Sequence, residues 1–213
     1  MEKVLLNCNW KMRKLGDENW LNAKVPGTVY CDLLDNGVME DPFWKDNEDK
    51  ALALMDNDYE YVTYFDCDNI LLSMSEVVLV FEGLDTLADI YLNDKKIASV
   101  ANMHRTWKYA VKEELKEQNN ELKIVFHSPT KFIDEAYAKA PTRGTEDAMN
   151  GFVHIRKAHY MFGWDWGAHL PDAGIWRPVY LLGMDMANIE SVNVMQYHED
   201  GKVRLELEPE VNV

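Results

Sequence analysis

Short, largely apolar stretches recur along most of the chain, and polar turns separate them. Each stretch is rich in β-branched and aromatic residues, which favour strands. The stretches occupy residues 59–65, 77–81, 88–92, 96–100, 106–111, 122–126, 175–182, 189–196 and 203–207. Many short strands at this spacing predict an antiparallel, all-β domain.

Turn and helix signals refine this pattern. Asn93-Asp94 separates two predicted strands, and both residue types tolerate the left-handed backbone of a tight hairpin. Two segments are predicted as helices: residues 29–36, ended by Gly37, and residues 130–139, ended before Pro141. We expect both helices to decorate a β-sandwich.

The remaining segments suggest how the chain is divided. Residues 141–151 are polar and turn-rich, which predicts an exposed loop of the kind that often faces a ligand. The last two predicted strands flank Asp200-Gly201, and no later element covers their apolar face. Because a two-stranded hairpin is marginal alone in water, we expect one sandwich over residues 1–185. Residues 186–213 are then the first strands of a second β-domain that is cut short.

Composition and charge exclude several classes of protein. Hydrophobic residues make up 47% of the chain and charged residues 28%, which is ordinary for a globular protein and too apolar for a disordered one. A net charge of −15 argues against nucleic acid or an anionic membrane as a partner, because like charges repel. A neutral ligand remains compatible with this charge.

The cysteines and the hydropathy suggest a cellular location. Cys8, Cys31 and Cys67 form an odd, widely spaced set without a CxxC pair, which favours free thiols in a reducing compartment. No apolar run reaches the roughly 18 residues that a membrane span needs, and no Asn-x-Ser/Thr site occurs. We therefore expect a cytoplasmic protein.

The densest group of unusual residues lies at 155–171, where Trp164 and Trp166 flank Asp165 and glycines lie on both sides. Sugars present apolar C–H faces and a rim of hydroxyls, so a sugar pocket needs flat aromatic platforms and a few fixed polar groups. Two tryptophans in a β-rich chain are, however, more commonly core residues. In a strand the tryptophans would share one face and Asp165 would point to the other. The flanking Gly163 and Gly167 favour a loop or bulge.

Two neighbouring motifs resemble a known family. The sequences Gly163-Trp164-Asp165-Trp166-Gly167 and Gly174-Ile175-Trp176-Arg177-Pro178-Val179 are similar to signatures of family 2 glycoside hydrolases of the β-mannosidase type. The segments 25–29, 41–43 and 81–93 support this resemblance, which covers nearly the whole chain up to about Met184. One departure is Ala168-His169, where relatives often carry Pro-Arg.

The resemblance implies both a fold and a function. It predicts a jelly-roll, galactose-binding-domain-like sandwich followed by an immunoglobulin-like sandwich, with the catalytic glutamates on a (β/α)8 barrel outside these residues. The intact protein is expected to be an exo-acting, retaining β-mannosidase that removes terminal non-reducing β-D-mannose from oligosaccharides. Asp165, Trp164 and Trp166 are then substrate-binding residues, and Arg156, His159 and His169 form a possible pocket rim. We expect no catalytic residue in this chain.

Other interpretations remain open at this point. The chain could be a free-standing carbohydrate-binding module, or a plain interaction sandwich without a sugar site. Arg156 and Lys157 either orient a polar ligand or form a solvated pair at the end of a loop. The spacing of His154 and His159 differs from that of a helical zinc pair, and phosphate-binding motifs are absent, so we expect neither a metal nor a cofactor.

Overall fold

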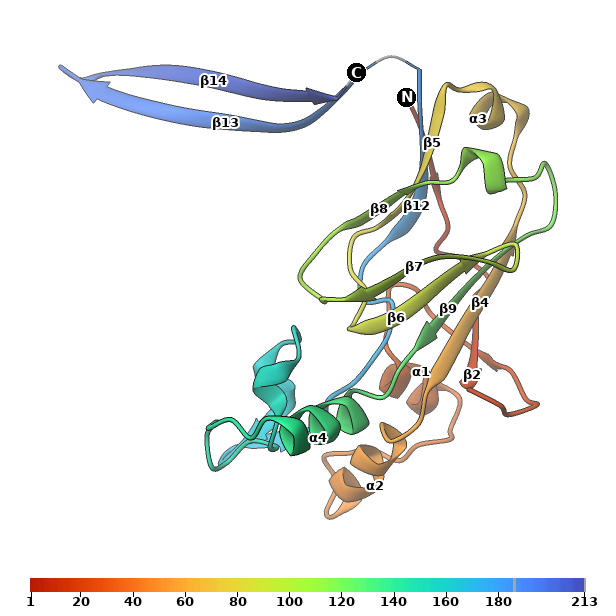
Figure 1. The fold of residues 1–213 in the computed structure, drawn as a ribbon, viewed down its shortest axis with the longest axis vertical. Coiled ribbons are helices and arrows are strands. Elements are labelled where there is room, and N and C mark those ends of the chain that lie inside the picture. The colour runs from red at the N-terminus through yellow and green to blue at the C-terminus, as the bar shows by residue number, and fades with distance from the viewer. Residues whose placement is uncertain (186, 213) are drawn as a thin grey trace.

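The computed structural model describes residues 1–185 and 187–212, and these form a two-layered β-sandwich with a separate hairpin (Figure 1). One layer is a six-stranded sheet with the order β3-β2-β4-β9-β6-β7, and the other is a four-stranded sheet with the order β1-β12-β5-β8. The named strands pair antiparallel. The prediction of an all-β sandwich with decorating helices is confirmed.

The bounds of the elements are as follows. The six-stranded sheet contains β2 (Lys11–Lys14), β3 (Leu21–Asn22), β4 (Tyr59–Phe65), β6 (Leu87–Leu92), β7 (Lys95–Ala101) and β9 (Asn120–Phe126). The four-stranded sheet contains β1 (Glu2–Leu5), β5 (Glu76–Phe81), β8 (Trp107–Ala110) and β12 (Val179–Met184). The helices are α1 (Val29–Asp35), α2 (Asn47–Leu54), α3 (Asn69–Ser73) and α4 (Pro129–Lys139), with 3-10 turns η1 (Lys112–Glu114), η2 (Phe152–His154) and η3 (His159–Met161).

Alternation along the strands produces the core between the two sheets. In β9 and β12 every second side chain is buried, as expected when one face of a strand packs inward. The core contains large aromatic side chains, among which Tyr61 and Phe126 meet edge to face with ring centroids 5.7 Å apart. Such a contact is a favourable arrangement for two aromatic rings.

The predicted turns and helices are present. Asn93 and Asp94 have φ values of 50° and 65°, the left-handed conformation that this hairpin requires. Helix α1 ends at Asp35, Asn36 is its C-cap, and Gly37 follows with φ 69°. In the predicted 141–151 loop, residues 141–147 are exposed, whereas Gly151 at its end is buried. The short strands β1 to β3 and the helices α2 and α3 were not predicted, because short elements carry little periodic signal.

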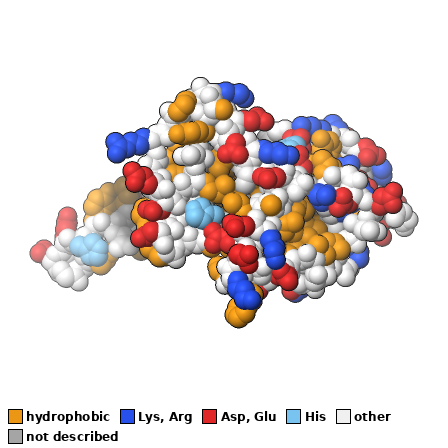
Figure 2. All heavy atoms as spheres, turned by 90° about the horizontal axis from the view of Figure 1, so that it is seen from below, with side chains coloured by type: hydrophobic (Ala, Val, Ile, Leu, Met, Phe, Trp, Pro, Cys, Tyr) orange, Lys and Arg blue, Asp and Glu red, His pale blue; other side chains and the backbone are white. Residues whose placement is uncertain are grey.

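The elements are distributed unevenly around the sandwich. Helices α1, α2 and α4 gather at one end, and the hairpin of β13 (Asn188–Glu199) and β14 (Lys202–Asn212) projects from the other (Figure 1). Figure 2 shows the helical end, where hydrophobic side chains lie at the surface between acidic and basic ones.

Among the residues that the structure describes, no helix has the length and apolar character to cross a membrane. The boundary predicted after residue 185 stays a prediction.

Candidate sugar-binding site

The Gly-Trp-Asp-Trp-Gly motif folds as a small hairpin, which we call the tryptophan hairpin (residues 162–169). Strand β10 (Phe162–Trp164) pairs with β11 (Gly167–His169) in the register Phe162↔His169 and Trp164↔Gly167. Asp165 and Trp166 therefore form a two-residue turn. The preference for a loop over a plain strand is confirmed, so the alternation of faces considered for a strand does not apply.

Only one of the two flanking glycines is required by the packing. Gly163 has φ 91°, and a Cβ atom there would lie 2.2 Å from Cδ2 of His169. At Gly167 a Cβ atom would make an ordinary contact of 3.7 Å with Cβ of Trp164. Gly163 thus allows the imidazole of His169 to pack against the backbone of the opposite strand.

The hairpin presents its aromatic residues to solvent. Trp164 is 44% exposed and Trp166 83% exposed, and Asp165 is also exposed at the turn. For these two tryptophans the core interpretation is therefore wrong. Large aromatic groups held in the open at a turn are typical of a binding surface rather than of packing.

An open pocket of about 860 Å³ lies beside the hairpin. Its lining combines α1, the segment before α2, the 141–151 loop, η2, η3 and the hairpin. The aromatic members are Tyr30, Phe43, Phe152, Tyr160, Trp164 and Trp166, and the polar members include Thr145, His159 and Asp172. The pocket is thus largely apolar with a few polar groups, a composition typical of small-molecule sites.

The three predicted rim residues are placed differently from one another. His159 lines the pocket, and its ring meets Phe152 edge to face at 4.9 Å. Arg156 is exposed and lies outside the lining, where its carbonyl accepts a hydrogen bond from the Met103 amide. His169 also lies outside the lining and connects the hairpin to α2.

The contacts of His169 brace the hairpin. Its amide donates to Oε1 of Glu48 at 2.8 Å, and its Nδ1 lies 2.8 Å from the same oxygen. Its Nε2 lies 3.1 Å from the carbonyl oxygen of Asp147 in the 141–151 loop. The hydrogen bond from the His169 amide, together with the imidazole, lowers the pKa of Glu48. His169 therefore joins the tryptophan hairpin to α2 and to the 141–151 loop.

A buried carboxyl group lies in the pocket wall. Asp172 is 8% exposed, and its Oδ1 accepts hydrogen bonds from the amides of Tyr30 at 3.1 Å and Ala173 at 2.7 Å. Burial raises the pKa of Asp172 to about 6, although these hydrogen bonds oppose the shift. Asp172 is not predicted from the sequence, because an aspartate before a predicted strand carries no local signal of burial.

Lys157 corrects the expectation for the Arg156-Lys157 pair. Its side chain is fully buried, and its ammonium contacts Oδ2 of Asp85 and, at 2.5 Å, the carbonyl oxygen of Asp172. It is neither solvated nor directed at a ligand in the pocket. A buried ammonium needs such partners, because burial without them is very costly.

Two further aromatic residues of the pocket were not predicted as site residues from the sequence. Phe43 is 77% exposed and Tyr160 is 76% exposed, and both line the pocket. The signal for Tyr160 was its place in the dense 155–171 cluster, and Phe43 follows a proline in a polar segment. No group of three or more metal-ligating side chains occurs within residues 1–185 and 187–212.

This geometry suits a neutral, hydroxyl-rich ligand with apolar faces. The exposed indoles of the lining provide platforms for C–H faces. Asp165 is exposed at the turn but lies outside the lining, and its carboxylate can accept charge-assisted hydrogen bonds from hydroxyl groups. Residues 10–177 match the family described as glycosyl hydrolase 2 galactose-binding domain-like. The chain belongs to this family. Its match includes both motifs up to Arg177, and therefore the whole tryptophan hairpin.

Relatives of this glycosyl hydrolase 2 domain include both a solved structure and curated proteins. A β-D-mannosidase from Dictyoglomus thermophilum is 36% identical with a TM-score of 0.95, over 100% of this chain and 26% of that chain. The β-mannosidase of Bos taurus is 29% identical over 87% of this chain and 22% of its own length. The β-mannosidase B of Thermothelomyces thermophilus is 33% identical over 84% and 21%, respectively. The chain therefore spans about a fifth of the length of these curated relatives.

Proposed function

We propose that this chain is the amino-terminal, sugar-pocket domain of a longer β-mannosidase. The intact protein would be exo-acting and retaining, and would release terminal β-D-mannose from the non-reducing end of oligosaccharides. The observation that carries the proposal is the exposed Trp164-Asp165-Trp166 turn beside a largely apolar pocket. The β-mannosidases among its relatives support the choice of mannose.

The proposed division of labour follows from the chemistry of glycoside hydrolysis. A retaining glycosidase needs two carboxyl groups about 5–5.5 Å apart, one on each side of the reacting centre. We propose that a (β/α)8 barrel elsewhere in the polypeptide supplies them, so that this chain alone is inactive. The domain would then supply Asp165 as a fixed acceptor that orients the sugar, while Trp164 and Trp166 form the wall. Orientation of this kind lowers the barrier without taking part in bond breaking.

The kinetic test of this proposal is the replacement Asp165→Ala in the full polypeptide. Loss of one charge-assisted hydrogen bond to the sugar should lower kcat/KM on an aryl β-mannoside at least tenfold. This corresponds to a loss of about 1.5–3 kcal/mol of transition-state stabilisation. The matched control is Glu146→Ala, which removes an exposed carboxylate from the neighbouring loop. The control should keep wild-type kinetics, and an unchanged kcat/KM in the Asp165 variant would contradict the proposal.

A second candidate function, a free-standing carbohydrate-binding module, is favoured by one observation. The described residues of this chain form a pocket with aromatic platforms by themselves. A module of this kind must bind sugar without a catalytic partner. Isothermal titration calorimetry of the 213-residue chain with mannose and mannobiose separates the two functions. The β-mannosidase proposal expects a millimolar or weaker dissociation constant for this chain alone, whereas tighter binding would favour the module.

The remaining proposals concern location and domain arrangement. Cys8 and Cys31 are exposed free thiols, which supports a reducing, cytoplasmic setting. The charge of −15 supports a neutral oligosaccharide as the partner, rather than nucleic acid or a membrane. The separate two-stranded sheet of β13 and β14 supports the start of an immunoglobulin-like domain after residue 185.

A further inference from the structure

Lys157 lies at the base of the segment that carries the tryptophan hairpin. Residues 157–161 form the limb that enters the hairpin, and residues 170–172 form the limb that leaves it. The ammonium of Lys157, on the entering limb, donates at 2.5 Å to the carbonyl oxygen of Asp172, which is 15 residues later on the leaving limb. A second bond joins the limbs, from the Leu170 amide to the Met161 carbonyl oxygen at 2.8 Å.

The same ammonium ties this base to the sandwich. It contacts Oδ2 of Asp85, whose side chain is 1% exposed, in the connection between β5 and β6. The backbone of Asp85 exchanges two hydrogen bonds of 2.9 Å with Gly174, just beyond the leaving limb. Asp85 thus holds the leaving limb through its backbone and both limbs through Lys157.

Packing alone does not account for a buried ion pair at this position. Taking an ammonium and a carboxylate out of water is costly, and apolar residues of similar volume often stabilise a fold equally well or better. In some proteins a buried polar or charged group specifies one arrangement of the chain, and breaking a buried pair by removing one partner is strongly destabilising. The hairpin above this pair carries the exposed Asp165, whose use depends on accurate placement.

We infer that Lys157 is a positioning residue for the sugar pocket, clamping the two limbs of the tryptophan hairpin to Asp85. This inference rests on the proposed function for its kinetic consequence, although the clamp itself is a property of this chain. Lys157 acts through the hairpin and through Asp165, and it does not touch the sugar.

The test uses a variant that removes both charges together. Lys157→Met alone leaves Asp85 buried without its cation and is expected to lower the thermal midpoint. The double variant Lys157→Met/Asp85→Asn should bring the midpoint back to within a few degrees of the wild type. Its segment 158–171 should nevertheless exchange amide hydrogens at least tenfold faster, measured by mass spectrometry on the 213-residue chain. The control Lys139→Met changes an exposed lysine of α4 and should alter neither quantity.

Kinetics of the full polypeptide separate positioning from stability. The double variant should lose at least tenfold in kcat/KM despite its restored stability, because small misplacement of a binding group is costly. Added to Asp165→Ala, it should lose clearly less than tenfold more, since part of the effect of Lys157 passes through Asp165. Recovery of activity together with stability, or a full additional loss on top of Asp165→Ala, would overturn the inference.

The two proposals fail in distinguishable ways. If Asp165→Ala leaves the kinetics unchanged, the proposed function fails, while hydrogen exchange of segment 158–171 still decides whether Lys157 clamps the hairpin. If the double variant does not fold, hydrogen exchange of the wild-type chain tests the clamp instead. The Leu170 amide should exchange as slowly as the amides of β9 in the core. Faster exchange of the Leu170 amide would overturn the inference.

Discussion

Asp172 shows how burial changes the behaviour of one carboxyl group in this domain. It lies in the pocket wall and accepts hydrogen bonds from backbone amides, yet burial raises its pKa to about 6. The folded protein therefore binds a proton more tightly than the unfolded chain does at this position. Stability from this group is fully present below about pH 4, the unfolded value, and is lost as pH rises through about 6.

This leads to a prediction for Asp172→Asn. A shift of roughly two pKa units corresponds to about 2–3 kcal/mol. Between pH 4 and pH 7 the free energy of unfolding of the wild type should therefore fall by about 2–3 kcal/mol more than that of the variant. Denaturant unfolding at pH 4, 5, 6 and 7 measures both curves. Parallel curves for the two proteins would contradict the raised pKa, since all other titrating groups are common to both.

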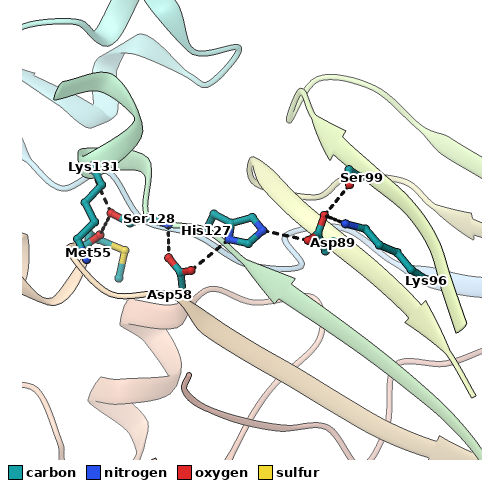
Figure 3. A network of polar contacts seen from close by, with 8 residues as sticks. All are labelled: Met55, Asp58, Asp89, Lys96, Ser99, His127, Ser128 and Lys131. Carbon is teal, nitrogen blue, oxygen red and sulfur yellow. Dashed lines mark hydrogen bonds and ion pairs between the residues drawn. The ribbon is translucent and has the colours of Figure 1, made fainter. Parts of the chain in front are cut away.

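At the scale of elements, a polar network joins the start of α4 to the strands on either side of β9 in the six-stranded sheet (Figure 3). Asp58 accepts the Ser128 amide at 2.9 Å and lies 3.1 Å from Nδ1 of His127. Nε2 of His127 lies 3.3 Å from Oδ2 of Asp89 on β6, and Asp89 also accepts the Ser99 hydroxyl of β7 at 2.6 Å. The network therefore fixes where α4 leaves the sheet.

Helix α4 in turn supports the pocket. A small core of Ile133, Phe152, Ile155 and Phe162 packs α4 against η2 and the first strand of the tryptophan hairpin. Gly151 fits closely here, because a Cβ atom would lie 2.3 Å from the carbonyl oxygen of Ile133. The position of the hairpin thus depends on α4 as well as on Lys157.

Ser128 provides the test at this scale. It is buried, caps α4 by accepting the Lys131 amide at 3.1 Å, and donates to the carbonyl oxygen of Met55 at 2.5 Å. Ser128→Ala should lower the free energy of unfolding by about 1–2 kcal/mol, because the cap is lost. The control Ser73→Ala removes an exposed hydroxyl and should change stability by less than about 0.5 kcal/mol. Equal losses in the two variants, measured by denaturant unfolding, would contradict this role for Ser128.

At the scale of the whole molecule, the β13–β14 hairpin is strongly two-sided. Directly opposed residues in an antiparallel pair lie on the same face. The pairs Val192↔Pro209 and Val194↔Leu207 thus belong to one apolar face, and Asn193↔Glu208 belongs to a polar face. Val194 and Leu207 are 47% and 59% exposed, so the apolar face is uncovered in this structure. Uncovered apolar faces of this kind are typical of interaction surfaces.

The apolar face gives a prediction for the isolated chain. Val194→Ser/Leu207→Ser should reduce binding of a fluorescent hydrophobic dye at least twofold, because it removes the centre of the exposed patch. We expect the main thermal transition to shift by less than about 2 °C, because β13 and β14 form a sheet of their own, outside the two sheets of the sandwich. The matched pair Asn193→Ser/Glu208→Gln alters the polar face and should leave dye binding unchanged. A large drop in the thermal midpoint of the first variant would mean that the hairpin stabilises the sandwich.

The sequence by itself determined the class of the fold and the position of its distinctive motif. Richness in β-branched and aromatic residues identified strands such as β4 and β9, because these side chains pack well on the pleated surface of a sheet. Asn93-Asp94 and Gly37 marked a turn and a helix end through their backbone preferences, which are local properties. The Gly-Trp-Asp-Trp-Gly motif pointed to the tryptophan hairpin for a similar reason, since turn residues and aromatic residues lie within one short segment.

Only the tertiary structure decided which of these residues are buried and which are presented to solvent. Lys157 meets Asp85 across 72 residues, and Asp172 meets the Tyr30 amide across 142. The local sequence does not reveal contacts between such distant residues. Lys157, next to Arg156, was therefore expected at the surface, although it is buried. The same holds for the two tryptophans, whose exposure follows from the turn and from the packing of α2 and α4 beneath it. Burial is a property of the whole assembly of elements, whereas propensity belongs to neighbouring residues.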